Sequence, residues 1–398
     1  MNKLLSPIAL LLLFSAVLVA QPKDRYVFVV SMDGFRADYI EKTRTPNFDK
    51  MARAGVSAVM TPSYPASTFP NHYTLATGLY PDHNGIVNNS FWDPDHQNLY
   101  KISGPSKCET YFYLGDPIWN TVQRQGVIAA TCYWVGSEYP IGGQLPRYYK
   151  RYTRYEIIPN KARIDTTLAW LQLPETVRPH LVMLYFNEPD HTGHMEGPGS
   201  KKTLKKVREM DKLLGRIRKG IAKLPIAGQI DLIVLSDHGM AEVSPERCVS
   251  ADNNLKKSWA ERIVYGNPTS IFSKDAACRD SIITALSGLE QIHVRKKEEI
   301  PAELPYGSSP RIGDVGVAPE LGWRFTDRPG TLKGAHGFFP SYPEMHVVFR
   351  ATGPDFKKGY KAEGFRNVSI YPLICHLLQI QASPNDGALE EVQGMLKK

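Results

Sequence analysis

The 398-residue sequence is poor in cysteine and lacks the spacing in which thiols usually act. Its five cysteines are Cys108, Cys132, Cys248, Cys278 and Cys375. No two of them form a Cys-x-x-Cys pair, which argues against a thiolate zinc site or a dithiol redox motif. In an exported chain Cys108–Cys132 or Cys248–Cys278 could pair. The odd number leaves at least one thiol unpaired, and for that one we expect a buried, inert position.

Several common catalytic signatures are missing as well. The sequence contains no Gly-x-Ser-x-Gly elbow, no Gly-x-Gly-x-x-Gly loop, no P-loop and no His-Glu-x-x-His zinc helix. Their absence argues against a serine hydrolase, a dinucleotide-dependent oxidoreductase, a P-loop NTPase and a zincin-type protease. Internal repeats and low-complexity tracts are also lacking.

Long hydrophobic runs are confined to the N-terminus. Lys3 precedes an apolar run from Ile8 to Ala20, which is too short to span a bilayer comfortably and is typical of a signal-peptide core. We expect residues 1–20 to be a cleaved signal peptide and the mature protein to be exported, periplasmic or secreted, without stable membrane insertion. A buried helix and a retained anchor are the alternatives. No cysteine near Ala20 supports a lipoprotein anchor.

Acidic residues are outnumbered, with Lys+Arg 48 against Asp+Glu 40 and a net charge of +8. Such an excess raises the question of a nucleic acid or membrane partner. The densest basic cluster lies on a predicted helix over residues 201–221, whose apolar residues share one face. We interpret this basic cluster as a solvated helix face and not as a binding site for the phosphate backbone of a nucleic acid. We therefore expect no specific nucleic acid partner.

The fold class follows from five short apolar runs that predict buried strands, at Tyr26–Ser31, Val127–Trp134, His180–Phe186, Ile230–Ser236 and Met345–Arg350. Helical patterns lie between them, which predicts an α/β fold with a mostly parallel central sheet flanked by helices. From Glu242 to Thr331 the pattern changes to short strand-like pieces with proline and glycine turns. We predict a small subdomain over residues 242–331, inserted into one domain of residues 21–398.

Acidic and imidazole residues follow the predicted strands, where open α/β sheets bind their ligands. The candidates are Asp33, Asp190, His191, His194, Asp237, His238 and, further downstream, His336. Carboxylates and imidazoles without thiolates suit Zn²⁺ or a similar ion. The set is too large for one tetrahedral ion and suits a pair ~3.5–4 Å apart, as used in phosphoryl transfer. Asp190 and His194 are four residues apart, so one helical turn could aim both at one ion. His191 fits least well.

A nucleophile candidate lies in the segment of residues 65–72. Pro70 fits the first position of a helix, which makes Thr68 or Phe69 the predicted cap. A hydroxyl there would lie in the positive field of the helix N-terminus, and a nearby metal could lower its pKa and create an alkoxide. Local sequence does not exclude Ser67 as the nucleophile.

These motifs resemble those of the nucleotide pyrophosphatase/phosphodiesterase (NPP) family of the alkaline phosphatase superfamily, from about Tyr26 to Leu378. The matching segments are Ser31-Met32-Asp33-Gly34-Phe35-Arg36, Thr68-Phe69-Pro70-Asn71-His72, Gly78-Leu79-Tyr80-Pro81, Gly115-Asp116-Pro117-Ile118-Trp119, Glu188-Pro189-Asp190 with Gly193-His194, Ser236-Asp237-His238-Gly239-Met240 and Gly334-Ala335-His336-Gly337. The resemblance implies an alkaline-phosphatase-like α/β fold. No segment here resembles the Cys-rich or nuclease-like modules of some animal relatives, so we expect these residues to correspond to the catalytic domain of the family.

The resemblance further implies two Zn²⁺ ions per chain. One ion would be held by Asp190, His194 and His336, and the other by Asp33, Asp237, His238 and Thr68. Thr68 matches the family nucleophile, which decides between it and Ser67.

Substrate-binding residues are also implied by the resemblance. Asn89 matches an asparagine that donates to a phosphoryl oxygen, and Phe69 and Tyr152 match aromatic residues that enclose a nucleobase. The alignment near Tyr152 needs a gap, so Tyr155 remains an alternative, and either tyrosine could instead serve in packing.

The implied activity is zinc-dependent hydrolysis of phosphodiester or pyrophosphate bonds in nucleotides, through a covalent phosphothreonine. The expected partner is a small-molecule nucleotide and the expected state a monomer. Alternatives are a phosphomonoesterase, which usually needs an extra cation that is not evident beside Thr68, and a choline- or glycerol-ester phosphodiesterase. A polyanion-binding module is the non-enzymatic alternative.

Overall fold

The computed structural model describes residues 25–152, 157–328 and 330–397, and the predicted signal peptide lies outside them. Among these residues, no helix is both long and apolar enough to cross a bilayer. The five cysteines all lie within the described part and are unpaired there, with Cys132 and Cys375 buried. Neither of the two possible disulfides is therefore formed.

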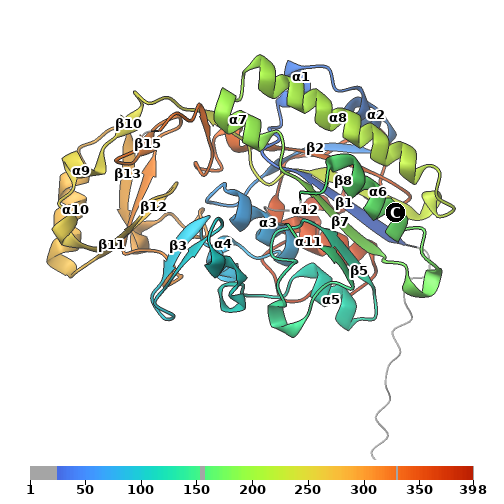
Figure 1. The fold of residues 1–398 in the computed structure, drawn as a ribbon, viewed down its shortest axis with the longest axis horizontal. Coiled ribbons are helices and arrows are strands. Elements are labelled where there is room, and N and C mark those ends of the chain that lie inside the picture. Colours follow the sequence, from blue (N-terminus) through green and yellow to red (C-terminus); the bar gives the residue numbers. More distant parts are fainter. Residues whose placement is uncertain (1–24, 153–156, 329, 398) are drawn as a thin grey trace, which may run out of the picture.

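A nine-stranded sheet runs through the main body of the described chain (Figure 1). Its order is β18 (Tyr360–Lys361), β2 (Val56–Thr61), β17 (Val347–Thr352), β8 (Ile230–Leu235), β1 (Tyr26–Met32), β7 (Leu181–Phe186), β5 (Ala129–Cys132) and β6 (Tyr148–Lys150), with β19 (Phe365–Arg366) also on β2. The strands from β8 to β6 are parallel, whereas β17 is antiparallel to both β8 and β2. The predicted α/β class and mostly parallel sheet are confirmed.

Helices cover both faces of this sheet. One face packs against α1 (Tyr39–Lys42), α2 (Pro46–Ala54), α6 (Asn160–Trp170) and α8 (Lys201–Ile221). The other face packs against α3 (Thr68–Thr77), α5 (Ile118–Arg124), α11 (Ile370–Leu377) and α12 (Glu390–Gln393). The short helix α4 (Pro81–Asn84) packs against α3. Because β1 contacts both layers, Val27 and Val29 belong to one core and Phe28 and Val30 to the other. Strands buried on both faces read as continuous apolar runs, which is why the sequence revealed them.

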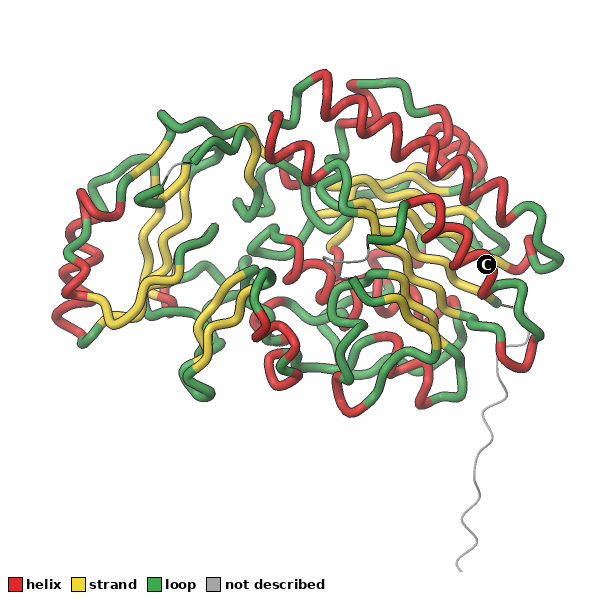
Figure 2. Tube along the Cα trace, in the orientation of Figure 1, coloured by secondary structure: helices red, strands yellow, loops and turns green. Residues whose placement is uncertain are grey.

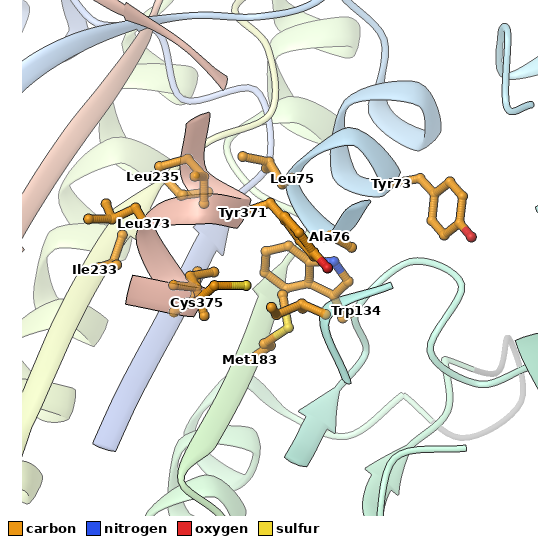
Figure 3. Packing of buried hydrophobic residues seen from close by; sticks show 14 of the residues in the cluster. Tyr73, Leu75, Ala76, Trp134, Met183, Ile233, Leu235, Tyr371, Leu373 and Cys375 are labelled. Atoms are coloured by element: carbon orange, nitrogen blue, oxygen red, sulfur yellow. The ribbon is translucent and has the colours of Figure 1, made fainter. Parts of the chain in front are cut away.

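The core beneath α3 and α11 fixes the position of α3. In Figure 3 the side chains of Leu373 and Cys375 on α11 lie beside Ile233 and Leu235 of β8, while the Tyr371 ring lies near Ala76 of α3 and Trp134. Helix α3 is thereby held against the sheet by large buried side chains. Thr68, the first residue of α3, is therefore held in a fixed position together with the helix.

The predicted basic helix is α8. Its apolar residues Val207, Leu214 and Ile217 are buried. Cations on its outer face pair with acids, as in Lys202–Glu196, Lys206–Glu209 and Arg216–Asp165. The helix therefore presents an ion-paired, solvated surface.

A second, smaller sheet lies apart from the main one, on the left of Figure 2. It is antiparallel, with the order β11 (Ala260–Val264), β12 (Thr269–Ser273), β14 (Val315–Pro319) and β13 (Ile292–Lys296). Helices α9 (Ala251–Asn254) and α10 (Ala276–Leu286) accompany it, and residues between 249 and 325 form its own hydrophobic core. This smaller sheet and its core lie within residues 242–331, and we call this part of the chain the subdomain.

Three two-stranded pairings complete the described strands. They are β10 (Cys248–Val249) with β15 (Arg324–Phe325), β9 (Ala241–Glu242) with β16 (Gly334–Ala335), and β3 (Ser90–Asp93) with β4 (Asn98–Lys101). The pair β9–β16 lies where the chain leaves the main body for the subdomain and where it returns. Together with α7 (Asp190–Glu196), it borders the carboxyl ends of the main strands.

Candidate metal centre

Three aspartates converge because they follow three neighbouring parallel strands. Asp33 directly follows β1, Asp237 follows β8, and Asp190 begins α7 after β7. Since β7 and β8 flank β1 in parallel register, their carboxyl ends meet at one edge of the sheet. The Asp190 backbone N–H donates to the Asp33 carbonyl at 3.0 Å, and the Gly34 N–H donates to Asp237 Oδ1 at 3.2 Å. Backbone hydrogen bonds therefore fix the aspartates relative to one another.

One group of potential ligands consists of Asp190, His194 and His336, whose ligand atoms lie within 4.8 Å of one another. Asp190 Oδ1 is 3.3 Å from His194 Nε2 and 3.9 Å from His336 Nε2. The first two residues share one turn of α7, as their spacing predicts. His194 Nδ1 lies 2.8 Å from the Gly334 carbonyl, which orients the ring so that Nε2 faces the group. We call these three residues the first group.

The second group consists of Asp33, Asp237 and His238, all buried, with ligand atoms within 4.8 Å. His238 Nε2 is 3.3 Å from Asp33 Oδ1 and 3.2 Å from Asp237 Oδ2, and its Nδ1 lies 2.7 Å from the Gly239 carbonyl. The rings of His238 and His336 stack with centroids 3.8 Å apart. The two groups are therefore immediate neighbours.

The residues of both groups fit divalent cations. Among the described residues, Asp33 Oδ1, Asp190 Oδ1, Asp237 Oδ2 and His336 Nδ1 are buried without a hydrogen-bond partner. An unpaired buried polar atom costs about 1–3 kcal/mol, and more if charged. A cation coordinated by these carboxylates would remove much of that cost, and carboxylate and imidazole donors without thiolates suit Zn²⁺.

The pKa shifts of the two carboxylates in the second group also favour a bound cation. Burial, and then the negative charge of Asp237, raise the pKa of Asp33 well above its ordinary value. Burial also acts on Asp237, but the imidazoles of His238 and His72 lower its pKa below the ordinary value. Two carboxylates this close repel each other in a buried site, and a divalent cation between them would neutralise that repulsion.

Thr68 lies at the edge of the second group. Its Oγ1 is 3.0 Å from His238 Nε2, and Thr68 is the first residue of α3. The helix cap is Ser67, with an extended backbone, so the prediction that Thr68 or Phe69 forms the cap is wrong. Pro70 is instead the third residue of the helix, which is tolerated because the first N–H groups of a helix have no intrahelical acceptor. The Thr68 hydroxyl still lies in the positive field of the helix start.

Asn89 and Phe69 lie beside Thr68. Asn89, just before β3, accepts a hydrogen bond through Oδ1 from the Phe69 backbone N–H at 3.0 Å. The partly buried Phe69 ring makes an edge contact with Tyr100, with centroids 6.4 Å apart. The structure thus brings Asn89 to the start of α3, next to the Thr68 hydroxyl.

The other predicted residues are Tyr152, Tyr155 and His191. The Tyr152 ring packs perpendicular to that of Tyr133 at 5.3 Å and joins the core beneath α6 and α8. Tyr155 falls outside the described residues. His191 is exposed and belongs to neither group.

Two supporting residues were given no role from the sequence. Tyr185 on β7 donates a 2.5 Å hydrogen bond to Asp33 Oδ2. His72 on α3 lies with Nδ1 3.2 Å from Asp237 Oδ2, while its Nε2 is 2.8 Å from the Ser31 hydroxyl. Tyr185 therefore orients one carboxylate of the second group, and His72 places an imidazole beside the other. No local sequence signal points to either residue, because Tyr185 comes to lie opposite Ser31, two residues before Asp33, only through the register of the sheet.

Comparison with known proteins decides the family. Residues 27–339 match the family described as type I phosphodiesterase / nucleotide pyrophosphatase. The chain belongs to this family. The resemblance seen in the sequence is thereby confirmed. Solved structures agree: murine ectonucleotide pyrophosphatase/phosphodiesterase 5, in an inactive form in complex with AMP, is 32% identical, with a TM-score of 0.89 over 94% of this chain and 100% of that one.

Curated relatives of this NPP-family chain are longer than it. A venom phosphodiesterase of Crotalus durissus collilineatus is 34% identical over 388 residues, which cover 93% of this chain and 46% of that protein. Ectonucleotide pyrophosphatase/phosphodiesterase family member 3 of Rattus norvegicus is 33% identical over 392 residues, covering 93% and 44%. The chain therefore spans about half the length of these relatives.

Proposed function

We propose that this chain hydrolyses phosphodiester or pyrophosphate bonds in nucleotides and releases a nucleoside 5′-monophosphate. The observation that carries the proposal is the Thr68 hydroxyl, held 3.0 Å from His238 Nε2 at the start of a buried helix and beside two groups of ligands. A positioned hydroxyl next to paired cation sites is the arrangement that in-line phosphoryl transfer requires.

The cofactor in this proposal is a pair of Zn²⁺ ions. Asp190, His194 and His336 would hold one, and Asp33, Asp237, His238 and the Thr68 oxygen the other. When bound, the two ions would lower the pKa of the hydroxyl, polarise the phosphoryl group and neutralise the charge that develops on it.

The chemistry on the protein is a double displacement at Thr68. The hydroxyl loses its proton to solvent, and Oγ1 forms a bond to phosphorus while the bond to the leaving oxygen breaks. The leaving group takes that electron pair and departs, which leaves a phosphothreonyl diester. Water then forms a bond to phosphorus, the bond to Thr68 breaks, and Thr68 regains a proton.

Substrate orientation would come from residues around the start of α3. The amide of Asn89 and backbone N–H groups near Thr68 would bind the non-bridging oxygens as negative charge builds. Phe69, with Tyr152 or Tyr155, would contact the nucleobase. The relatives support a nucleotide substrate, since one is a nucleotide pyrophosphatase/phosphodiesterase and a solved relative is in complex with AMP.

The proposal extends to organisation and location. Residues 1–20 would be a cleaved signal peptide, residues 21–398 the catalytic domain and residues 242–331 its inserted subdomain. Export to the periplasm or medium agrees with similarity to venom phosphodiesterases and ectonucleotidases. We propose a monomer.

One comparison of substrates tests the activity. The zinc-loaded enzyme should hydrolyse a 4-nitrophenyl nucleoside 5′-phosphate diester with a far higher kcat/KM than 4-nitrophenyl phosphate or a 4-nitrophenyl phosphocholine ester. Dominant hydrolysis of the monoester would identify a phosphomonoesterase, and dominant hydrolysis of the choline ester a lipid-type diesterase. Either result would overturn the proposal. A steep salt dependence of nucleic acid binding without turnover would favour a polyanion-binding module.

A further inference from the structure

A cavity of about 340 Å³ opens beside the first group. His194 and His336 form part of its wall, so the cavity is continuous with that group. The described residues that line it are His194, Tyr265, Gly266, Asn267, Pro319, Trp323, Arg324, Phe325, Thr326, Leu332, Ala335 and His336. Its size is in the range of small-molecule sites.

The opposite wall of this cavity comes from the inserted subdomain. Arg324 and Phe325 form β15, Trp323 precedes them, and Tyr265 lies between β11 and β12. The Arg324 backbone N–H donates to the Arg247 carbonyl at 3.0 Å, which fixes β15 against β10. In Figure 1, α7 and α3 lie on the side of the main body nearer the subdomain. The subdomain therefore reaches the edge of the metal centre.

Charge distinguishes this cavity from the second group. Among the described residues that line it, Arg324 is the only one with a permanent charge, and none carries a carboxylate. The adjoining first group has one carboxylate for a divalent ion, whereas the second group has two. The charges of the lining residues therefore favour an anionic ligand over a cationic one.

The geometry of in-line phosphoryl transfer indicates which part of the substrate would occupy the cavity. In phosphoryl transfer the attacking and leaving oxygens lie roughly in line on opposite sides of phosphorus. Thr68 contacts the second group through His238. A substrate attacked in line, with its leaving oxygen over the first group, would extend into the cavity lined by His194, His336 and Arg324.

We propose that this cavity binds the leaving group of a nucleotide polyphosphate, with the Arg324 guanidinium contacting its phosphates. The inference rests on the proposed function and assigns the inserted subdomain a role in substrate choice. Trp323 and Tyr265 offer aromatic surface to an organic group carried by those phosphates, as in a dinucleoside polyphosphate. Guanidinium forms strong charge-assisted hydrogen bonds to phosphate.

The test compares two leaving groups on the same enzyme. ATP and a 4-nitrophenyl nucleoside 5′-phosphate both release a nucleoside monophosphate, but only ATP has a charged polyphosphate leaving group. The readout is the ratio of kcat/KM for ATP to kcat/KM for the aryl ester. Arg324→Gln should lower this ratio roughly tenfold to a hundredfold, while Arg324→Lys, which keeps the charge, should recover part of it.

A matched control is available on another strand of the subdomain. Arg295 on β13 is exposed and lines a different cavity, so Arg295→Gln should leave the ratio within about twofold of wild type. Calorimetric titration of ATP into zinc-loaded Thr68→Ala protein gives a readout without turnover. There Arg324→Gln should weaken ATP binding by a similar factor and AMP binding far less.

The outcomes separate this inference from the proposed function. A wild-type enzyme that fails to hydrolyse the aryl ester would refute the proposed function itself. An active wild type whose ratio and ATP affinity are unchanged in a folded Arg324→Gln variant would refute only the leaving-group site. Circular dichroism and thermal unfolding of each variant establish that it is folded.

Discussion

At the scale of single residues, burying the carboxylates of the site costs free energy when the chain folds. Asp33, Asp190 and Asp237 each keep a buried oxygen without a hydrogen-bond partner in the described structure, at about 1–3 kcal/mol or more apiece. Some buried charges elsewhere are paired, as in Arg311 with Asp93 at 2.9 Å, whereas Asp231 on β8 also keeps one buried oxygen without a partner. Unpaired atoms concentrated at one sheet edge indicate a site that is completed by something outside the chain.

Tyr185 tests whether orientation of a carboxylate supports metal binding. Tyr185→Phe removes the hydroxyl that donates to Asp33 Oδ2, and loss of such a supporting contact typically weakens metal affinity about 10–100-fold. Competition with a chelator of known affinity measures the change. Tyr73→Phe is the matched control, because the Tyr73 hydroxyl is buried without a partner. Equal zinc affinity in wild type and Tyr185→Phe would contradict the supporting role.

Asp231 on β8 makes stability depend on pH independently of the metal centre. Burial, and then the nearby Asp355 charge, raise its pKa to about 8. The unfolded chain titrates near the ordinary value of 3.8, so between about pH 4 and 8 the native state binds more protons than the unfolded state. The free energy of unfolding contributed by Asp231 therefore falls as pH rises through this window.

Asp231→Asn should remove that dependence. We expect the variant to unfold at a higher Tm than wild type at about pH 8.5 by a few degrees, with the advantage shrinking or vanishing at about pH 5. Thermal unfolding of both proteins at the two pH values measures it. A difference in Tm that stays constant with pH would show that Asp231 is not protonated in the folded protein at intermediate pH.

At the scale of elements, the strands that carry the site could be predicted from the sequence, whereas β2 and β6 could not. β1, β7 and β8 are buried along almost their whole length and appear in the sequence as apolar runs. β2 alternates between buried and more exposed positions, and β6 is largely exposed, so neither gives a continuous apolar signal. The ligand candidates followed because parallel strands end together.

Contacts that depend on strand register or helix packing could not be predicted from the sequence. Tyr185 and Asp33 are 152 residues apart, and His72 reaches Asp237 from a helix on another segment. No local pattern relates such partners, because strand pairing and helix packing alone bring them together. The cap of α3 was misjudged because proline is permitted at more than one position of the first turn.

Gly34 tests the turn that joins β1 to the site. Its φ of +65° is left-handed, and a Cβ there would lie 2.8 Å from the Asp190 Cβ. Gly34→Ala should displace Asp190, lower bound zinc and reduce kcat/KM for the diester by at least about tenfold, in line with the metal affinity at stake. Elemental analysis and kinetics measure both.

Gly126→Ala provides the control for backbone strain alone. Gly126 has φ +82°, but an added Cβ there meets no atom within 4 Å. Both substitutions carry the left-handed penalty of about 1–2 kcal/mol, so Gly126→Ala should lose stability and keep its zinc and activity. Equal zinc loss in both variants would show that strain, and not contact with Asp190, is responsible.

At the scale of the whole molecule, the candidate metal centre brings the main sheet together with the segment of chain that follows the subdomain. The first group combines α7 with His336, which follows β16 after the subdomain. Ions bound there would tie these segments together and stabilise the native state by preferential binding. Removal of metal by a chelator should lower Tm, and added Zn²⁺ should restore it. An unchanged Tm, with metal loss verified by elemental analysis, would contradict this link.

The central claim is that Thr68 is the nucleophile between two metal sites, and the most direct measurement is turnover of the zinc-loaded Thr68→Ala variant. We predict a loss of about 10³-fold or more in kcat for a nucleoside phosphodiester, with two zinc ions per chain retained. Ser67→Ala, which removes the adjacent hydroxyl, should keep most of the activity. Full activity in Thr68→Ala with its metal intact would contradict the account.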